Sequence, residues 1–364
     1  VDLPHDFVVE REPTRELPPG AAWSRYAANN GHNNHMMHGF KPGGVGWYRK
    51  RFRVPAEDEG RRLALVFDGL FRHSTVWLNQ NFVGEWLSGY MGVEYDVSAL
   101  LNFGGLNTLT VRVDAREYEG WFYEGAGIYR HVWLVKRDPI HIPSHGVFVR
   151  CAADPATDRA ELRVEVEVAN TTAEDRTAVV EVAICDPEGR RVAEASAPVA
   201  VPAGATATAA PAVVLTAPAW WSLETPRLYS AGCRVREGAA LRDEETVAFG
   251  VRSIRFDPDR GFLLNERPVK LKGVCCHQDH AGVGSALPDR VHEFRIERLK
   301  AMGCNAYRTA HHPPAPELLE ACDRLGMLVM DETRVMGTAP EYRDRLIDLV
   351  RRDRNHPSVI LWSI

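Results

Sequence analysis

The sequence predicts two β domains followed by the first half of a (β/α)8 TIM barrel. Up to about residue 250, short runs alternate apolar and polar residues, the period of two that is typical of half-buried β-strands. Beyond that point, strand-like runs alternate with segments of helical period, which indicates βαβ units around a parallel sheet. A length of 364 residues also favours two or three domains over one.

Residues 1–137 form the first predicted β domain. Apolar-rich runs are separated by turns rich in Asn and Gly, at residues 79–81 and 104–105. Short strands at this spacing are typical of a sandwich or jelly roll. The expected strands are Gly46–Val54, Leu63–Phe67, Ser74–Leu78 and Leu109–Val113.

A histidine-rich segment, residues 29–38, interrupts this domain. His32, His35 and His38 follow one another at a spacing of three, and imidazole is a common zinc ligand. The surrounding Asn and Gly residues predict neither a helix nor a strand that would fix the ligand geometry. We therefore interpret the segment as a polar surface loop and assign it no metal.

Residues 138–250 predict an immunoglobulin-like sandwich. Apolar residues alternate with charged ones from Leu162 to Val168, so one face of this strand packs and the other is wet. Further strands are expected at Ala178–Ile184 and Leu228–Val235, on either side of an Ala-, Pro- and Thr-rich stretch. No cluster of reactive side chains occurs here, which indicates a role in spacing and packing.

Residues 251–364 predict four βα units of a barrel. The expected strands are Val269–Val274, Cys304–Thr309, Met327–Met330 and Ser358–Ser363. Each intervening segment places apolar residues on one helical face. These residues are Val291, Phe294, Leu299 and Met302 in the first helix, Leu318, Leu319, Cys322 and Leu325 in the second, and Tyr342, Leu346, Leu349 and Val350 in the third.

Polar side chains follow the first three of these strands. They are His277 and His280, then Arg308, His311 and His312, then Asp331 and Glu332. In a (β/α)8 barrel all carboxyl ends of the strands meet at one face, where active sites lie. One such group would be read as a loop that caps a helix, but three in succession favour a functional site.

Several long motifs then carry a family resemblance. Lys272–His280, Gly303–His311, Cys322–Glu332 and Arg354–Ile364 resemble the catalytic barrel of glycoside hydrolase family 2, and Glu119–Leu134 resembles its sugar-binding domain. The family includes β-galactosidases, β-glucuronidases and β-mannosidases. The resemblance covers nearly the whole chain and implies that the first domain is a jelly roll which reaches toward the active site.

The resemblance implies a retaining exo-β-glycosidase, with β-galactosidase favoured and β-glucuronidase as the alternative. In the family, Trp-Ser-Ile precedes Gly-Asn-Glu, whose Glu is the acid/base, and the nucleophilic Glu comes later. We therefore expect a chain truncated just before the acid/base, without either catalytic residue and inactive alone. A non-catalytic carbohydrate-binding module is the rival from another class, but it would not need three polar strand ends.

The resemblance also implies particular substrate contacts. His277 and His311 are expected to bind sugar hydroxyls, because neutral imidazole offers one donor and one acceptor. Arg308 is expected in the site, with a buried ion pair as the alternative. Glu124 is expected to close the sugar pocket, with a surface charge beside a Gly turn as the alternative.

Asp331 and Glu332 suggest a catalytic pair, since glycoside hydrolysis uses two carboxyl groups. Adjacent residues of a strand face opposite ways, so both cannot reach one pocket. We therefore assign them a supporting role.

No metal and no cofactor are expected. The adjacent Cys275 and Cys276 do not have the spacing of zinc ligands. The magnesium-binding Glu and His of some family members are absent from residues 333–338.

Composition bounds the remaining partners. A net charge of -5 without a basic stripe argues against nucleic acid, and no apolar run has membrane-spanning length. Seven cysteines without a repeated spacing indicate free thiols. A cytoplasmic location is favoured, although a chain that begins at Val1 leads us to expect a missing N-terminus. Homo-oligomerisation of the full-length protein stays open.

Overall fold

The computed structural model describes residues 1–14, 39–116 and 122–364, which form two compact units. The first unit contains Val1–Lys136, Cys276–His292 and Thr309–Ala315, and the second contains Arg137–Cys275, Glu293–Arg308 and Pro316–Ile364. The histidine-rich segment and Trp121 lie outside the described residues. The first unit thus combines the first β domain with two segments that follow barrel strands.

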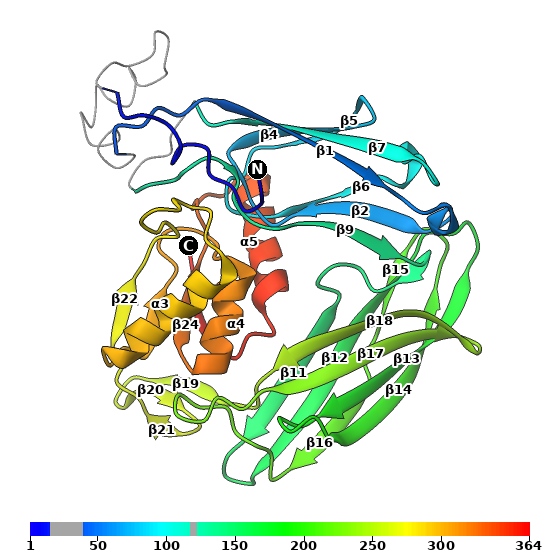
Figure 1. The fold of residues 1–364 in the computed structure, drawn as a ribbon. Coiled ribbons are helices and arrows are strands. Elements are labelled where there is room, and N and C mark those ends of the chain that lie inside the picture. Colours follow the sequence, from blue (N-terminus) through cyan, green and yellow to red (C-terminus); the bar gives the residue numbers. More distant parts are fainter. Residues whose placement is uncertain (15–38, 117–121) are drawn as a thin grey trace. The chain divides into compact units, whose positions relative to one another are not determined.

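The first unit is built around β-sheets, as predicted (Figure 1). One sheet has the strand order β1-β7-β4-β5, a second has the order β6-β2-β9, and β3 pairs with β8. The strands are β1 (Val45–Arg53), β2 (Arg62–Phe67), β3 (Leu70–Phe71), β4 (His73–Leu78), β5 (Asn81–Trp86), β6 (Val93–Asp96), β7 (Leu106–Asp114), β8 (Gly127–Ile128) and β9 (Val132–Arg137), with short 3-10 helices at Ala56–Asp58 and Ser98–Leu100.

Side chains alternate between the two faces of each strand, and the face that carries the apolar residues is buried. In β7, Leu109, Val111 and Val113 are buried, while the residues between them are half-exposed. The predicted turn after β4 is formed by Asn79 and Gln80, with φ of 51° and 70°. Asn tolerates this left-handed conformation better than most residues do. The turn therefore occurs where the sequence predicted it.

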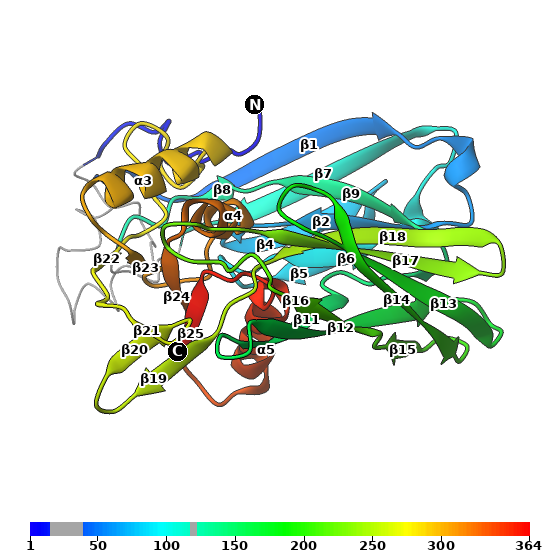
Figure 2. The ribbon, with the colours of Figure 1, turned by 90° about the horizontal axis from the view of Figure 1, so that it is seen from below.

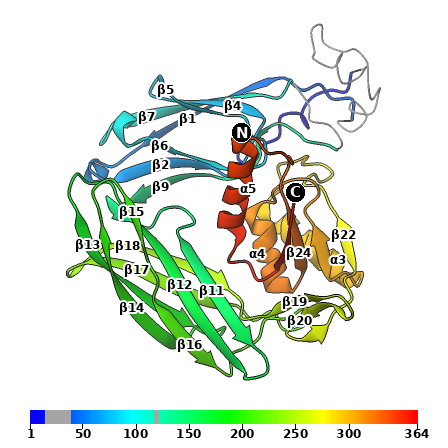
Figure 3. The same ribbon diagram turned by 180° about the vertical axis from the view of Figure 1, so that it is seen from behind.

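The second unit begins with a two-sheet sandwich, which Figure 3 shows from behind. One sheet contains β10, β11, β12, β15 and β16, and the other has the order β14-β13-β17-β18. The strands are β10 (Ile140–His141), β11 (Val147–Asp154), β12 (Arg159–Asn170), β13 (Arg176–Cys185), β14 (Arg191–Val201), β15 (Thr206–Ala209), β16 (Ala212–Thr216), β17 (Tyr229–Glu237) and β18 (Ala240–Phe249). Inward-facing residues such as Val164, Val166 and Val180 share one core.

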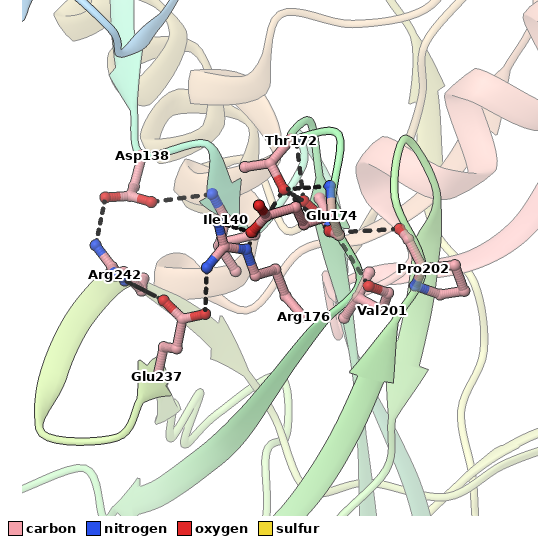
Figure 4. Close-up of polar contacts among 10 residues, drawn as sticks. Asp138, Ile140, Thr172, Glu174, Arg176, Val201, Pro202, Glu237 and Arg242 are labelled. Atoms are coloured by element: carbon pink, nitrogen blue, oxygen red, sulfur yellow. Dashed lines mark hydrogen bonds and ion pairs between the residues drawn. The ribbon is translucent and has the colours of Figure 1, made fainter.

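A polar network closes one end of this sandwich (Figure 4). Asn170, at the end of β12, donates Nδ2–H bonds to the carbonyls of Glu174, Val201 and Pro202 at 2.8, 3.0 and 3.2 Å. Beside it, Arg242 forms ion pairs with Asp138 and Glu237. Asn170 is 1% exposed and Val201 is 0% exposed, so the Asn170 amide and the Val201 carbonyl meet away from bulk water.

We therefore expect Asn170→Ala to lower the free energy of unfolding by about 1–3 kcal/mol, the usual cost of leaving buried polar groups without partners. Urea unfolding measures the change. The exposed Thr177→Ala in β13 is the control, and an equal effect of the two substitutions would contradict a special role for Asn170.

The last part of the second unit is an α/β layer. Its sheet has the order β22-β23-β24-β25 and is parallel throughout, as predicted (Figure 2). The strands are β22 (Gly273–Cys275), β23 (Ala306–Arg308), β24 (Leu328–Glu332) and β25 (Val359–Ser363), and the helices are α3 (Asp289–Ala301), α4 (Pro316–Leu325) and α5 (Pro340–Asp353). This is the βαβ arrangement expected for the start of a barrel.

Two features of this part differ from the prediction. The apolar face assigned to α3 is wrong, because Phe294 and Met302 are 40% and 74% exposed while Ile296 is fully buried. In addition, an antiparallel sheet precedes β22, formed by β19 (Ile254–Asp257), β20 (Gly261–Leu264) and β21 (Arg267–Pro268).

The antiparallel sheet supplies part of a shared core. Phe262 and Leu264 from β20 pack with Trp221, Leu328 and Ile360. The Trp221 indole is fully buried and donates to the Asp323 carbonyl at 2.9 Å. All seven cysteines are free thiols, as predicted. Among the residues that the structure describes, each helix is too short or too polar to cross a membrane.

Candidate functional site

Arg130 connects the two barrel segments of the first unit with its β domain. Its Nη2 donates to Gln278 Oε1 at 2.6 Å and to the Pro313 carbonyl at 2.8 Å, while Nη1 donates to the Tyr90 carbonyl at 2.9 Å. The residue is 4% exposed, so these charge-assisted bonds form away from bulk water. One guanidinium therefore fixes the Gln278 side chain beside His277 and the Pro313 backbone beside His312.

Asp6, near the beginning of the chain, holds the first of these segments, Cys276–His292, against the β domain. Its Oδ2 accepts bonds from the Ser285 backbone N–H and hydroxyl at 2.9 and 3.1 Å and from the Tyr123 hydroxyl at 2.9 Å. Its Oδ1 accepts from the Ala126 N–H at 3.0 Å. A Cβ at Gly284 would lie 2.3 Å from Asp6 Oδ2, so this close approach requires glycine.

Three histidines gather around Phe122 in this unit. The ring centroids of Phe122 and His277 are 4.4 Å apart, and those of His277 and His311 are 5.8 Å apart. His312 stacks on Tyr90 with centroids 4.5 Å apart and planes 10° apart, and its Nδ1 lies 2.9 Å from the Pro313 carbonyl. His277 and His311 are both half-buried, whereas His312 is 3% exposed. The structure thus brings the two predicted substrate histidines together.

Glu124 also lies in this unit and is 1% exposed. The interpretation as a surface charge is therefore wrong. A buried carboxylate is stable only with hydrogen-bond or ionic partners, so the surroundings of Glu124 must provide them. A role of Glu124 in closing a sugar pocket stays a prediction.

Arg308 and Glu332 form an ion pair in the second unit. Arg308 Nε donates to Glu332 Oε2 at 2.5 Å, and the Ser363 hydroxyl donates to the same oxygen at 3.2 Å. The contact with Glu332 raises the pKa of the Arg308 guanidinium. Glu332 is 5% exposed and the Arg308 side chain is 37% exposed, so Arg308 forms the ion pair of the alternative, but only its partner is buried. A substrate contact of Arg308 stays a prediction.

Asp331 points to a different partner, Asp353 at the end of α5. Burial and the neighbouring Asp353 carboxylate raise the pKa of Asp331 well above its usual range. Burial acts in the same direction on Asp353, but the Arg352 guanidinium, His356 and Asp331 together outweigh it and lower the pKa of Asp353. Both carboxyl groups are fully buried. The two shifts have opposite directions, so Asp331 keeps its proton to a higher pH than Asp353 does.

Comparisons with known proteins identify the family. Three domain models match the chain: the galactose-binding domain-like model of glycosyl hydrolase 2 at residues 45–133, the glycosyl hydrolases family 2 model at residues 140–252, and the TIM barrel domain of the same family at residues 258–343. The chain belongs to glycosyl hydrolase family 2.

Relatives in family 2 carry two kinds of name. The chain is 37% identical to the beta-galactosidase BoGH2A of Bacteroides ovatus, covering all of this chain and 42% of that protein. It is 34% identical to a putative beta-glucuronidase of Formosa agariphila, covering 90% of this chain and 32% of that protein. A family 2 structure from Bacteroides cellulosilyticus aligns with a TM-score of 0.88 at 36% identity, over all of this chain and 48% of that one.

The chain therefore spans about a third to a half of the length of these family 2 relatives. The fold class predicted from the sequence, with a galactose-binding-like domain, an immunoglobulin-like domain and part of a TIM barrel, is confirmed. The boundaries 1–137, 138–250 and 251–364 stay a prediction.

Several residues that hold the polar clusters of the two units together were not predicted from the sequence. Arg130 lies within the segment that carried the resemblance, and Gln278 lies beside His277, but neither showed a local sign of its partner. No sequence pattern marked Asp6 or Asp353 as a residue with a structural or functional role. A partner 148 residues away, as for Arg130 and Gln278, is not visible in local periodicity.

Proposed function

We propose that the full-length protein containing this chain is a retaining exo-β-glycosidase that releases terminal β-galactosyl residues. The observation that carries the proposal is the pair of half-buried imidazoles, His277 and His311, around Phe122. An imidazole can both donate to and accept from a sugar hydroxyl. The names of the family 2 relatives, which include several β-galactosidases, support the same reaction class.

We further propose that the acid/base and the nucleophile are not among residues 1–364. Retaining glycosidases use two carboxyl groups roughly 5–5.5 Å apart, both in contact with the sugar. Asp331 is fully buried against Asp353, and Glu332 is engaged by Arg308 and Ser363. Neither supports a catalytic role, so a protein comprising only residues 1–364 should release no nitrophenol from nitrophenyl glycosides.

β-Glucuronidase is the second candidate function. It is favoured by the relatives that carry this name. Among them is a protein of Bacteroides fragilis that is 31% identical in an alignment covering 88% of this chain. The two candidates differ by one sugar carboxylate. The ratio of kcat/KM for nitrophenyl β-galactoside and nitrophenyl β-glucuronide, measured with the full-length protein, distinguishes them.

In the full-length protein, His311→Ala should lower kcat/KM by about 10- to 100-fold, because a hydroxyl partner of the sugar is lost at a cost of roughly 1–3 kcal/mol. The matched control is His73→Ala, which removes an exposed histidine that pairs with Glu85 on the first domain. Nitrophenol release from the favoured substrate measures both variants.

Unchanged kinetics for His311→Ala would remove this residue from the site. A full-length protein that binds galactosides but turns none over would favour the carbohydrate-binding module instead. Retention of configuration is checked by proton NMR of the first anomer released, and an inverted product would contradict the glycosyl-enzyme intermediate.

A further inference from the structure

A groove lies on the first unit, over the face of the sheet β1-β7-β4-β5 that is opposite the domain core. It has a volume of about 850 Å³. Four strands and the chain near the second 3-10 helix contribute to it. Its lining residues are Trp47, Arg49, Arg51, Trp77, Asn79, Gln80, Asn81, Ala99, Leu100, Leu101, Asn102, Thr108 and Thr110.

Two indoles form the floor of this groove. Trp47 of β1 and Trp77 of β4 stack with centroids 5.8 Å apart and planes 21° apart. Trp47 is 63% exposed. Single exposed apolar side chains are common, but a stacked pair of indoles in a polar groove is typical of a binding surface. The flat apolar faces of pyranose rings match such a platform.

The charged side chains that line the groove, Arg49 and Arg51, are both positive. Arg49 and Arg51 alternate with inward-facing residues on β1, so both project to the same face as Trp47. Within the described part of the chain, neither arginine forms an ion pair, and the groove lining contains no acidic side chain. Thr108 and Thr110 lie directly opposite Arg51 and Arg49 in the neighbouring strand β7 and add hydroxyl groups.

The rim of the groove is fixed before any ligand binds. Asn79 Nδ2 donates to the Leu100 carbonyl at 2.8 Å and to Asn107 Oδ1 at 2.7 Å, and its Oδ1 accepts from the Thr108 N–H at 2.9 Å. These bonds tie the β4–β5 turn to the chain near Leu100. A preformed groove loses less conformational entropy when it binds a ligand.

We propose that this groove binds an acidic oligosaccharide, a chain of uronic acid residues, separately from the site around His277 and His311. Sugar rings would stack on Trp47 and Trp77. Their carboxylates would be bound by Arg49 and Arg51, whose guanidinium groups match carboxylate geometry. Thr108, Thr110 and Gln80 would hydrogen-bond to hydroxyl groups. Such a site would hold a polymeric substrate near the enzyme.

The test uses the full-length protein and isothermal titration calorimetry with hexagalacturonate as the probe. Cellohexaose, a neutral chain of equal length, is the charge control, and an oligothymidylate tests for a nucleic acid ligand. Trp47→Ala and the double variant Arg49→Gln/Arg51→Gln remove the platform and the charge. Their matched controls are Trp133→Ala and Arg53→Gln, an exposed indole and an exposed arginine outside the groove.

We expect hexagalacturonate to bind and both groove variants to weaken binding roughly tenfold or more, because buried aromatic and Arg anchors dominate such interfaces. Binding should persist in His311→Ala, and turnover of nitrophenyl glycosides should be unchanged in Trp47→Ala, which separates this site from the proposed active site. Higher salt should weaken binding, since the contacts are between charges.

Three outcomes would overturn the proposal. They are the absence of hexagalacturonate binding, equal binding of cellohexaose, and groove variants that bind like their controls. Tighter binding of oligothymidylate than of hexagalacturonate would assign the groove to a nucleic acid instead. None of these results depends on which glycoside the enzyme hydrolyses.

Discussion

Asp353→Ala is expected to lower the free energy of unfolding by about 3–5 kcal/mol, because it breaks a buried ion pair and leaves one charge behind. Asp353 is fully buried, and its two oxygens accept from Arg352 Nε and Nη2 at 2.7 Å each. The Arg352 side chain is itself only 10% exposed. Urea unfolding followed by tryptophan fluorescence measures the change.

Asp331→Asn should behave in the opposite way. A protonated carboxyl group and an amide have nearly the same shape, and an amide N–H is, like a carboxyl O–H, a donor that an ionised Asp353 can accept. The substitution also removes a carboxyl group whose ionisation burial and Asp353 disfavour. At pH 7 we therefore expect stability equal to or above that of the wild type. Destabilisation as large as that of Asp353→Ala would contradict a proton on Asp331.

The pH dependence gives an independent check. The raised pKa of Asp331 contributes stability that is complete below its ordinary value of 3.8 and is lost as pH rises through the folded-state pKa. The lowered pKa of Asp353 contributes stability that is present above 3.8 and is lost as pH falls. Asp331→Asn leaves only the second effect, so its stability should rise more steeply from acid to neutral pH than that of the wild type.

Local pattern was enough to predict the architecture. The local pattern of apolar residues reports how each strand is buried by its neighbours. It is an alternation with a period of two in β7 and β12, and a short apolar run in β23, β24 and β25. The polar strand ends were visible for a related reason. His277 and His311 each follow closely on a predicted strand, and the structure brings their ring centroids to 5.8 Å from one another.

Other elements depend on partners that local sequence does not show. Strands β15 and β16 arise in the Ala-, Pro- and Thr-rich stretch because β12 pairs with both of them, at Val166–Ala169 and Arg159–Arg163. In α3, charged residues flank Ile296 on both sides, so the apolar face was assigned to Phe294 and Met302, which are exposed. The pairing of Asp331 with Asp353 spans a whole βα unit and has no periodic signal.

The largest effect on catalysis is expected from Arg130→Lys, which should lower kcat/KM of the full-length enzyme roughly 100-fold. Lysine keeps the positive charge but lacks the planar fork that reaches Tyr90 with one nitrogen and Gln278 and Pro313 with the other. Displacement of the segments around His277 and His311 by about 1 Å is enough for such a loss. The exposed ion pair of Arg62 with Asp96 on the same unit supplies the control variant, Arg62→Lys.

A positioning role predicts more than a loss of activity. Arg130→Lys should act through the histidines, so combining it with His311→Ala should cost much less than the product of the two single effects. A purely structural role would instead lower the midpoint of thermal unfolding and leave kcat/KM unchanged well below that midpoint. Fully multiplicative effects of the two substitutions on kcat/KM would show that Arg130 and His311 act independently, and would contradict the connection through Gln278 and Pro313.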